Sequence, residues 1–93
     1  ERTNALGIMA KIKYRPPKPT FYLKEDYEAV AWCHKNKITM HVVPGYMVDR
    51  AGDYYVEITI KGKVFYSPPY TKDDVSLKQK EFYHYYKNKY ENN

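Results

Sequence analysis

The side chains best suited to bind a metal ion or to act as a nucleophile are few, and their spacing suits neither task. They are one cysteine and three histidines, namely Cys33, His34, His41 and His84. Cys33 and His34 are adjacent in a stretch with helical periodicity, so their side chains diverge by about 100° and do not converge on one ion. The sequence has no CxxC or HxxxH pair, and no glycine-rich turn that would form an oxyanion hole for a Cys33 nucleophile. We therefore expect no metal site, with Cys33 a small packing residue, His34 on the core side of its helix, and the other two histidines at the surface.

Other catalytic and cofactor motifs are missing as well. The four glycines are scattered singly, so neither a P-loop nor a dinucleotide-binding fingerprint is present. Asp49, Asp53 and Glu57 do not have the spacing of a calcium-binding loop. The sequence therefore predicts a protein that is not an enzyme and that has no cofactor and no small-molecule substrate.

The abundant side chains are those of lysine and tyrosine, and they suit binding better than catalysis. Lysine and arginine number 16 against 11 acidic residues, which gives a net charge of +5 at pH 7, and 12 residues are tyrosine. A basic balance favours contact with nucleic acid, an anionic surface or an acidic protein. Tyrosine buries a ring while its hydroxyl stays hydrated, which suits interfaces and base stacking alike. A composition rich in lysine, tyrosine and asparagine is also typical of an A/T-rich genome, so it favours a binding surface without naming the partner.

Two segments concentrate the basic residues, and we predict contact with nucleic acid or another partner at both. Residues 11–20 read KIKYRPPKPT, in which prolines hold the chain extended. In the last third of the chain, basic residues recur at helical spacing beside a tyrosine. The alternatives are an extended connector packed along the domain for the first segment and a merely solvated helix face for the second. The predicted contact residues are Lys11, Lys13, Arg15 and Lys18 in the first segment and Lys80, Tyr83, His84 and Lys87 in the second.

The elements that position these residues are built around residues 54–60. Apolar and polar side chains alternate there with the two-residue period of a strand that is buried on one face. Lys61-Gly62 interrupts the pattern as a hairpin turn, residues 63–66 form the return strand, and Pro68-Pro69 ends it. The sequence therefore predicts a β-hairpin at the centre of the chain.

The register of this hairpin depends on the length of its loop. A two-residue loop pairs Ile58 with Phe65 on the apolar face. A three-residue loop would place Val64 and Tyr66 on that face instead. We favour the two-residue loop, because Phe65 is the more demanding side chain to bury.

The segment before the hairpin predicts a helix followed by a strand. Residues 24–36 have a helical period, and the stripe expected to face the core comprises Leu23, Tyr27, Val30, Ala31 and His34. Asn36 is expected to take the left-handed conformation that often ends a helix. Residues 38–43 alternate as the first strand, Pro44-Gly45 marks a turn or a bulge, and residues 46–48 are expected to resume the strand.

The second helix has the most specific start signal in the chain. Thr71 is a good N-cap, and Asp74 stands three residues later in the capping-box position. We expect the helix to end near Lys89. Its core face is expected to comprise Val75, Gln79, Phe82 and Tyr86, extended by Tyr83 and Tyr90.

These elements predict a single α+β domain over residues 21–93, with the order α-β-β-β-α and two helices packed on one face of a three-stranded antiparallel meander. Residues 1–20 are expected to form an extended, proline-rich basic arm. Residues 1–8 precede a methionine of the kind that starts translation, so we interpret them as a tag or non-native segment and leave them out of the fold. The alternative is a native flexible tail or part of a partner-bound arm. The expected core packs Ile38, Met40, Val42, Val56, Ile58 and Ile60 of the sheet against Tyr27, Val30 and Phe82 of the helices.

Double-stranded-RNA-binding domains are similar to this chain in the order of their elements, and they contact phosphates near the start of their second helix. A lysine-rich run opens that helix in those domains. Here the segment reads TKDDVS, which places Asp73 and Asp74 where the phosphates would lie. The likeness is one of element order alone, so we assign no family.

Two functions fit these observations. The first is a small non-enzymatic binding module that contacts nucleic-acid phosphates through a lysine and tyrosine surface with low sequence specificity. The alternative is a protein-interaction or assembly subunit, such as a small accessory protein of a phage or mobile element, that packs on another protein or on a second copy of itself. The lone cysteine, and the lack of a signal peptide or a long apolar run, lead us to expect a cytoplasmic location and no membrane partner.

Overall fold

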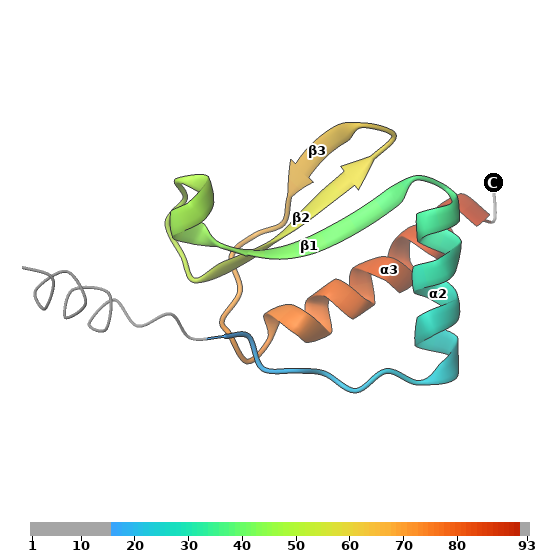
Figure 1. The fold of residues 1–93 in the computed structure, drawn as a ribbon, viewed down its shortest axis with the longest axis horizontal. Helices are drawn as coiled ribbons and strands as arrows, with labels where there is room; N and C mark the ends of the chain where they lie inside the picture. Colours follow the sequence, from blue (N-terminus) through green and yellow to red (C-terminus); the bar gives the residue numbers. More distant parts are fainter. Residues whose placement is uncertain (1–15, 92–93) are drawn as a thin grey trace, which may run out of the picture.

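The structure is a computed structural model that describes residues 16–91. Its elements are α2 (Lys24–Lys35), β1 (Ile38–Pro44), the 3-10 helix η1 (Gly45–Val48), β2 (Tyr54–Ile60), β3 (Lys63–Tyr66) and α3 (Val75–Glu91). The strands form one antiparallel sheet in the order β1-β2-β3, and both helices pack on one face of it (Figure 1). The predicted fold class and the order α-β-β-β-α are therefore confirmed. Most of the predicted arm, including Lys11, Lys13 and Arg15, lies outside the described residues.

The turn at Lys61-Gly62 sets the register of the β2–β3 hairpin. Lys61 and Gly62 both have a positive φ, at 50° and 87°. Two such residues in succession form the type I′ turn, whose twist matches that of the flanking strands. Ile58 therefore pairs with Phe65, which confirms the two-residue loop. β1 pairs with β2 over the full length of both strands.

The hydrophobic core lies between the sheet and the two helices. Its buried residues are Ala29, Cys33, Ile38, Met40, Tyr54, Val56, Ile58, Val75 and Tyr83. Partly exposed residues packed against them are Val30, Trp32, Val42, Ile60, Tyr70, Phe82 and Tyr86. The predicted apolar face of the sheet and the packing role of Cys33 are thus confirmed. The predicted core side of α3 is confirmed except at Tyr90, which is 41% exposed. Tyr27 is wrongly predicted as a core residue, because it is 64% exposed.

The predicted core stripe of α2 is confirmed only at Val30, because the helix is rotated relative to that prediction. Leu23 and Tyr27 are exposed, whereas Asp26, Ala29 and Cys33 are buried. The three buried residues recur at i, i+3 and i+7, and their side chains are short, so α2 approaches α3 closely. A prediction based on hydrophobicity alone misses this buried face of α2, because the first of its three residues is the charged Asp26.

Two backbone predictions on either side of β1 are also corrected. Residues 46–48 belong to η1 instead of a resumed strand. The backbone N–H of Gly45 donates to the carbonyl of Asp53 at 2.9 Å, which closes the connection to β2 as a compact loop. At the end of α2, Asn36 has a φ of −99°, and Lys37, with a φ of 63°, takes the left-handed conformation.

The start of α3 lies slightly later than predicted. Thr71 Oγ1 contacts Asp74 Oδ2 at 3.2 Å, and the backbone N–H groups of Asp74 and Val75 donate to the Thr71 carbonyl. These contacts form a turn that leads into the α-helix at Val75. The predicted capping pair, Thr71 and Asp74, therefore lies in the turn just before the helix. The helix ends at Glu91, two residues beyond the predicted end.

The two helices cover only part of the sheet. α3 packs on β1 and β2, and α2 packs on β1. β3 is the edge strand farthest from β1 and extends away from the helices (Figure 1). Phe65 points to the helix side of the sheet like its partner Ile58, yet it is 49% exposed. The helix-facing side of β3 is thus open to solvent.

Replacing Gly62 with alanine should lower the free energy of unfolding by about 1 kcal/mol. A Cβ at this position would meet no heavy atom within 4 Å, so the destabilisation would come from the positive φ alone. Urea denaturation followed by circular dichroism measures the change. Lys61→Asn is the matched control, because asparagine tolerates the left-handed conformation and should not destabilise the hairpin. A Gly62→Ala protein as stable as the original would contradict the type I′ turn.

Candidate functional site

Three sides of α3 have different surroundings. Val75 and Tyr83 are buried in the core. Lys80 and His84 lie on the side next to α2, where both contact a carboxylate of that helix. Lys89 follows Lys80 by nine residues, which is two and a half turns, so it lies on the opposite side of α3. That opposite side borders the open face of β3.

A groove lies between this side of α3 and the β2–β3 hairpin. It encloses about 410 Å³. Three aromatic side chains and three lysines line it, namely Phe65, Tyr86, Tyr90, Lys61, Lys63 and Lys89. We call it the hairpin groove and define it by these six residues. It exists because the two helices cover β1 and β2 and leave β3 open.

The aromatic rings of the hairpin groove are accessible and pack against one another. Tyr86 and Tyr90, one helical turn apart, stack with ring centroids 6.1 Å apart and planes inclined by 11°. Phe65 and Tyr90 are 49% and 41% exposed, so flat apolar surface is presented to solvent. Burial raises the pKa of the Tyr86 phenol above its ordinary value of 10.0.

The lysines make the groove basic. Within residues 16–91, no carboxylate lines the groove and no ion pair engages Lys61, Lys63 or Lys89. Lys89 Nζ instead lies 5.4 Å from the centroid of the Tyr90 ring and 5.8 Å from that of Tyr85, which is cation–π geometry. The groove therefore combines uncompensated positive charge with exposed rings.

Two neighbouring hollows extend this surface. One of about 330 Å³ shares Lys61 and Tyr90 with the hairpin groove and adds Trp32 of α2. The other, of about 260 Å³, lies toward the start of α3 and contains Lys78 paired with Glu81 at 3.2 Å. Its lining residues are Tyr70, Lys78, Glu81, Phe82 and Tyr85. Aromatic and basic side chains thus continue along α3 over about 18 Å, given a rise of 1.5 Å per residue.

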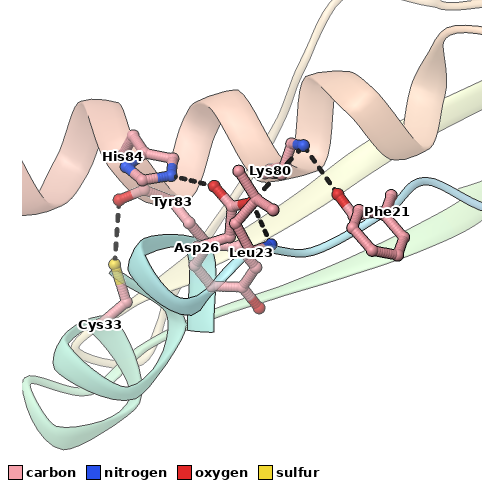
Figure 2. A network of polar contacts seen from close by, with 7 residues as sticks. All are labelled: Phe21, Leu23, Asp26, Cys33, Lys80, Tyr83 and His84. Carbon is pink, nitrogen blue, oxygen red and sulfur yellow. Dashed lines mark hydrogen bonds and ion pairs between the residues drawn. The ribbon is translucent and has the colours of Figure 1, made fainter. Parts of the chain in front are cut away.

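Lys80 and His84, two of the predicted contact residues, are engaged inside the fold with a buried carboxylate (Figure 2). Asp26 is 6% exposed, and its two oxygens accept hydrogen bonds from His84 Nε2 and from the backbone N–H of Leu23, both at 2.7 Å. Lys80 Nζ lies 3.6 Å from Asp26 Oδ2 and donates to the carbonyl of Phe21 at 2.9 Å. We call this cluster the Asp26 network. It ties α3 to α2 and to the chain that precedes α2.

Tyr83, which is predicted to stack on a partner, is instead part of the core. It is 4% exposed, and its carbonyl accepts a hydrogen bond from Cys33 Sγ at 3.4 Å (Figure 2). His34 meets the ring edge-on, with centroids 5.8 Å apart, although His34 itself is exposed and not buried on the core side. The Tyr83 ring is therefore not free to stack on a nucleotide.

The other predicted contact residues lie apart from one another. Lys87 follows Lys80 by two helical turns, so it lies on the same side of α3; its side chain is 27% exposed and pairs with Glu91 at 2.8 Å. Lys18 is exposed, and its backbone N–H donates to the carbonyl of Lys72 at 2.8 Å. The described part of the arm therefore runs beside the turn before α3. Within residues 16–91, Lys18 lies beside the turn before α3, whereas the predicted contact residues of α3 lie on its side next to α2 or, for Tyr83, in the core.

Nucleophile and metal chemistry have no visible basis in residues 16–91. Cys33 is fully buried, and burial raises the pKa of its thiol to about 11, so the thiol is protonated at neutral pH. Within the same residues, no three side chains of histidine, cysteine, aspartate or glutamate come together as metal ligands would. No helix in this part of the chain is both long and apolar enough to cross a membrane.

Sequence reasoning overlooks the hairpin groove, although one signal for it is present. Lysines and aromatic residues recur along the second helix at i, i+4, i+7 and i+11, a stripe distinct from the one that contains Lys80 and His84. The members of this overlooked stripe are Lys78, Phe82, Tyr85 and Lys89, of which Lys89 lines the hairpin groove and the other three line the neighbouring hollow. Its significance depends on where the hairpin lies, which the helix sequence does not reveal.

Comparison with models of known protein families, with curated proteins and with solved structures gives no match for this chain. No activity or partner can therefore be carried over from a relative. Function has to be argued from the geometry of the site itself.

Replacing Asp26 with asparagine should lower the thermal midpoint of unfolding by several degrees at neutral pH, because Lys80 and His84 lose their carboxylate partner. The hydrogen bond from Leu23, then that from His84, holds the pKa of Asp26 below its ordinary value of 3.8. Asp26 therefore stabilises the fold above that ordinary value, and the stabilisation is lost as the pH falls through the lower pKa of the folded state. Thermal denaturation from about pH 2 to pH 7 should show a flatter acid limb for Asp26→Asn.

Asp73→Asn is the matched control for this experiment. The Asp73 carboxylate is exposed and pairs with Lys72 at 3.3 Å, and exposed pairs of this kind contribute little to stability. Its midpoint and acid limb should match those of the original protein. An Asp26→Asn protein that also matches would contradict a structural role for the Asp26 network.

Proposed function

We propose that this protein is a small non-enzymatic binding module that contacts nucleic acid through the hairpin groove. The observation that carries the proposal is the meeting, in one recess, of accessible aromatic rings with three lysines that form no ion pair within the described chain. Lysines neutralise phosphates and aromatic rings stack on bases. The two kinds of side chain thus match the two chemical parts of a nucleotide.

The dominance of lysine supports contact with low sequence specificity. An ammonium group is a point charge, without the planar fork through which arginine recognises guanine or phosphate in two places at once. Arg50 is the one arginine within residues 16–91. Its guanidinium lies 4.3 Å from the centroid of the Tyr66 ring, on the face of the sheet that the helices do not cover. Among residues 16–91, the cations that line the groove are therefore all lysines.

Self-association through β3 is the second candidate function. β3 is an edge strand, and its Val64 and Phe65 are 52% and 49% exposed. An uncovered edge strand with apolar side chains can pair with a strand of another chain. Lys61 and Lys63 stand at the same edge, however, and edge lysines oppose the pairing of two identical strands. This charge is why we place nucleic-acid contact first.

Lys61→Asn combined with Lys63→Gln should weaken binding to generic RNA and DNA and reduce its dependence on salt. Loss of two phosphate contacts lowers the slope of log affinity against log salt by about 1.4 for a single strand and about 1.8 for a duplex. Asparagine is chosen at position 61 because the residue there has a φ of 50°. Fluorescence anisotropy with labelled oligonucleotides over a salt series measures both quantities.

Lys24→Gln combined with Lys72→Gln removes the same charge from the start of α2 and the turn before α3, and should leave binding nearly unchanged. Light scattering on the same samples gives the molar mass. Absence of binding to any nucleic acid at low salt would overturn the proposed function. A defined dimer without nucleic-acid binding would establish the second candidate in its place.

A further inference from the structure

We infer that the hairpin groove takes single-stranded in preference to double-stranded nucleic acid. The inference rests on the proposed function and specifies its substrate class. Its basis is the position of the rings, which lie within a recess, together with the placement of the lysines on both of its sides.

The rings line a recess, and a base that enters it can lie against them. Phe65 projects from β3 on the helix side of the sheet, and Tyr86 and Tyr90 line the groove from α3. The space of about 410 Å³ between them falls within the range of pockets that hold a small organic molecule, about 300 to 1,000 Å³. A base with its sugar can therefore lie against the exposed faces of Phe65 or Tyr90.

A duplex cannot use these rings. Each base in a duplex is stacked between its neighbours, so only base edges and phosphates face the protein. A base would have to be unpaired and unstacked before it could enter the groove. A duplex would thus contact the lysines and leave the aromatic surface uncovered.

A single strand satisfies both sets of side chains at once. Lys61 and Lys63 stand on the hairpin side of the groove and Lys89 on the helix side, so a backbone that passes over the groove meets cations from both. Lys89 Nζ lies over the Tyr90 ring in the free protein. A phosphate that attracts this ammonium would uncover the ring for a base. The adjoining hollow beside Trp32 provides a further ring for the next base along the strand.

Competition for the protein between a single-stranded oligonucleotide and a duplex of the same base composition tests the inference. A labelled single strand of about twelve nucleotides is bound at low salt and followed by anisotropy. Unlabelled single strand or duplex is then added as competitor. We expect the single strand to displace the labelled strand at a concentration at least about tenfold lower than the duplex, because two or more of its bases can stack on rings that a duplex cannot reach.

Two ring variants test the mechanism. Phe65→Leu and Tyr90→Leu keep an apolar side chain and remove the flat ring, so each should weaken single-strand binding about fivefold or more while duplex binding stays the same. Tyr46→Leu is the matched control, because Tyr46 is 65% exposed on η1, at the other end of β2 from the hairpin turn (Figure 1). Circular dichroism establishes that each variant is folded.

The outcomes separate this inference from the proposed function. Equal competition by single strand and duplex, or single-strand binding that neither ring variant weakens, would overturn the inference while nucleic-acid binding stands. Binding of neither species by the original protein would overturn both. Preference for the single strand, lost in both ring variants and kept in Tyr46→Leu, would establish it.

Discussion

The orientation of α3 depends on one buried carboxylate. A charge removed from water is tolerated only when it is paired and hydrogen-bonded, and Asp26 finds its partners in the Leu23 amide and in Lys80 and His84 of α3. One side of α3 therefore contacts α2, and these contacts fix the rotation of α3 about its own axis. The small side chains of Ala29 and Cys33 let the two helices approach closely enough for these contacts.

The same orientation explains the hairpin groove. With one side of α3 committed to α2 and a second side packed on β1 and β2, the remaining aromatic and basic side faces the hairpin. The two helices pack on β1 and β2 and leave β3 open, so Phe65 stays half exposed. Rings that a larger core would enclose are thus available to a ligand, and the lysines beside them favour an anionic one. The proposed function therefore uses a surface that the packing leaves unfilled.

Local sequence signals are sufficient to predict much of this fold. The alternation in β2 and the turn at Lys61-Gly62 each have a clear period or geometry, so the strand order and the pairing of the hairpin are predicted correctly. The rotation of α2 is not, because Asp26 resembles a surface residue until its partner His84, 58 residues later, is placed beside it. That long-range pairing also engages Lys80 and His84, so these two predicted contact residues lie on the side of α3 opposite Lys89 and the hairpin groove. Whether Phe65 is covered depends on the relative positions of α3 and β3, which no local pattern encodes.

The central claim is that nucleic acid meets this protein at the hairpin groove, on the side of α3 opposite the Asp26 network. Titration of isotope-labelled protein with a short single-stranded oligonucleotide, followed through the backbone amide chemical shifts, tests this claim most directly. The account predicts that the largest changes occur at the Lys61-Gly62 turn, in β3 and in the last turns of α3, with small changes at η1. Changes centred on Lys18 and Lys80, or no changes at all, would contradict it.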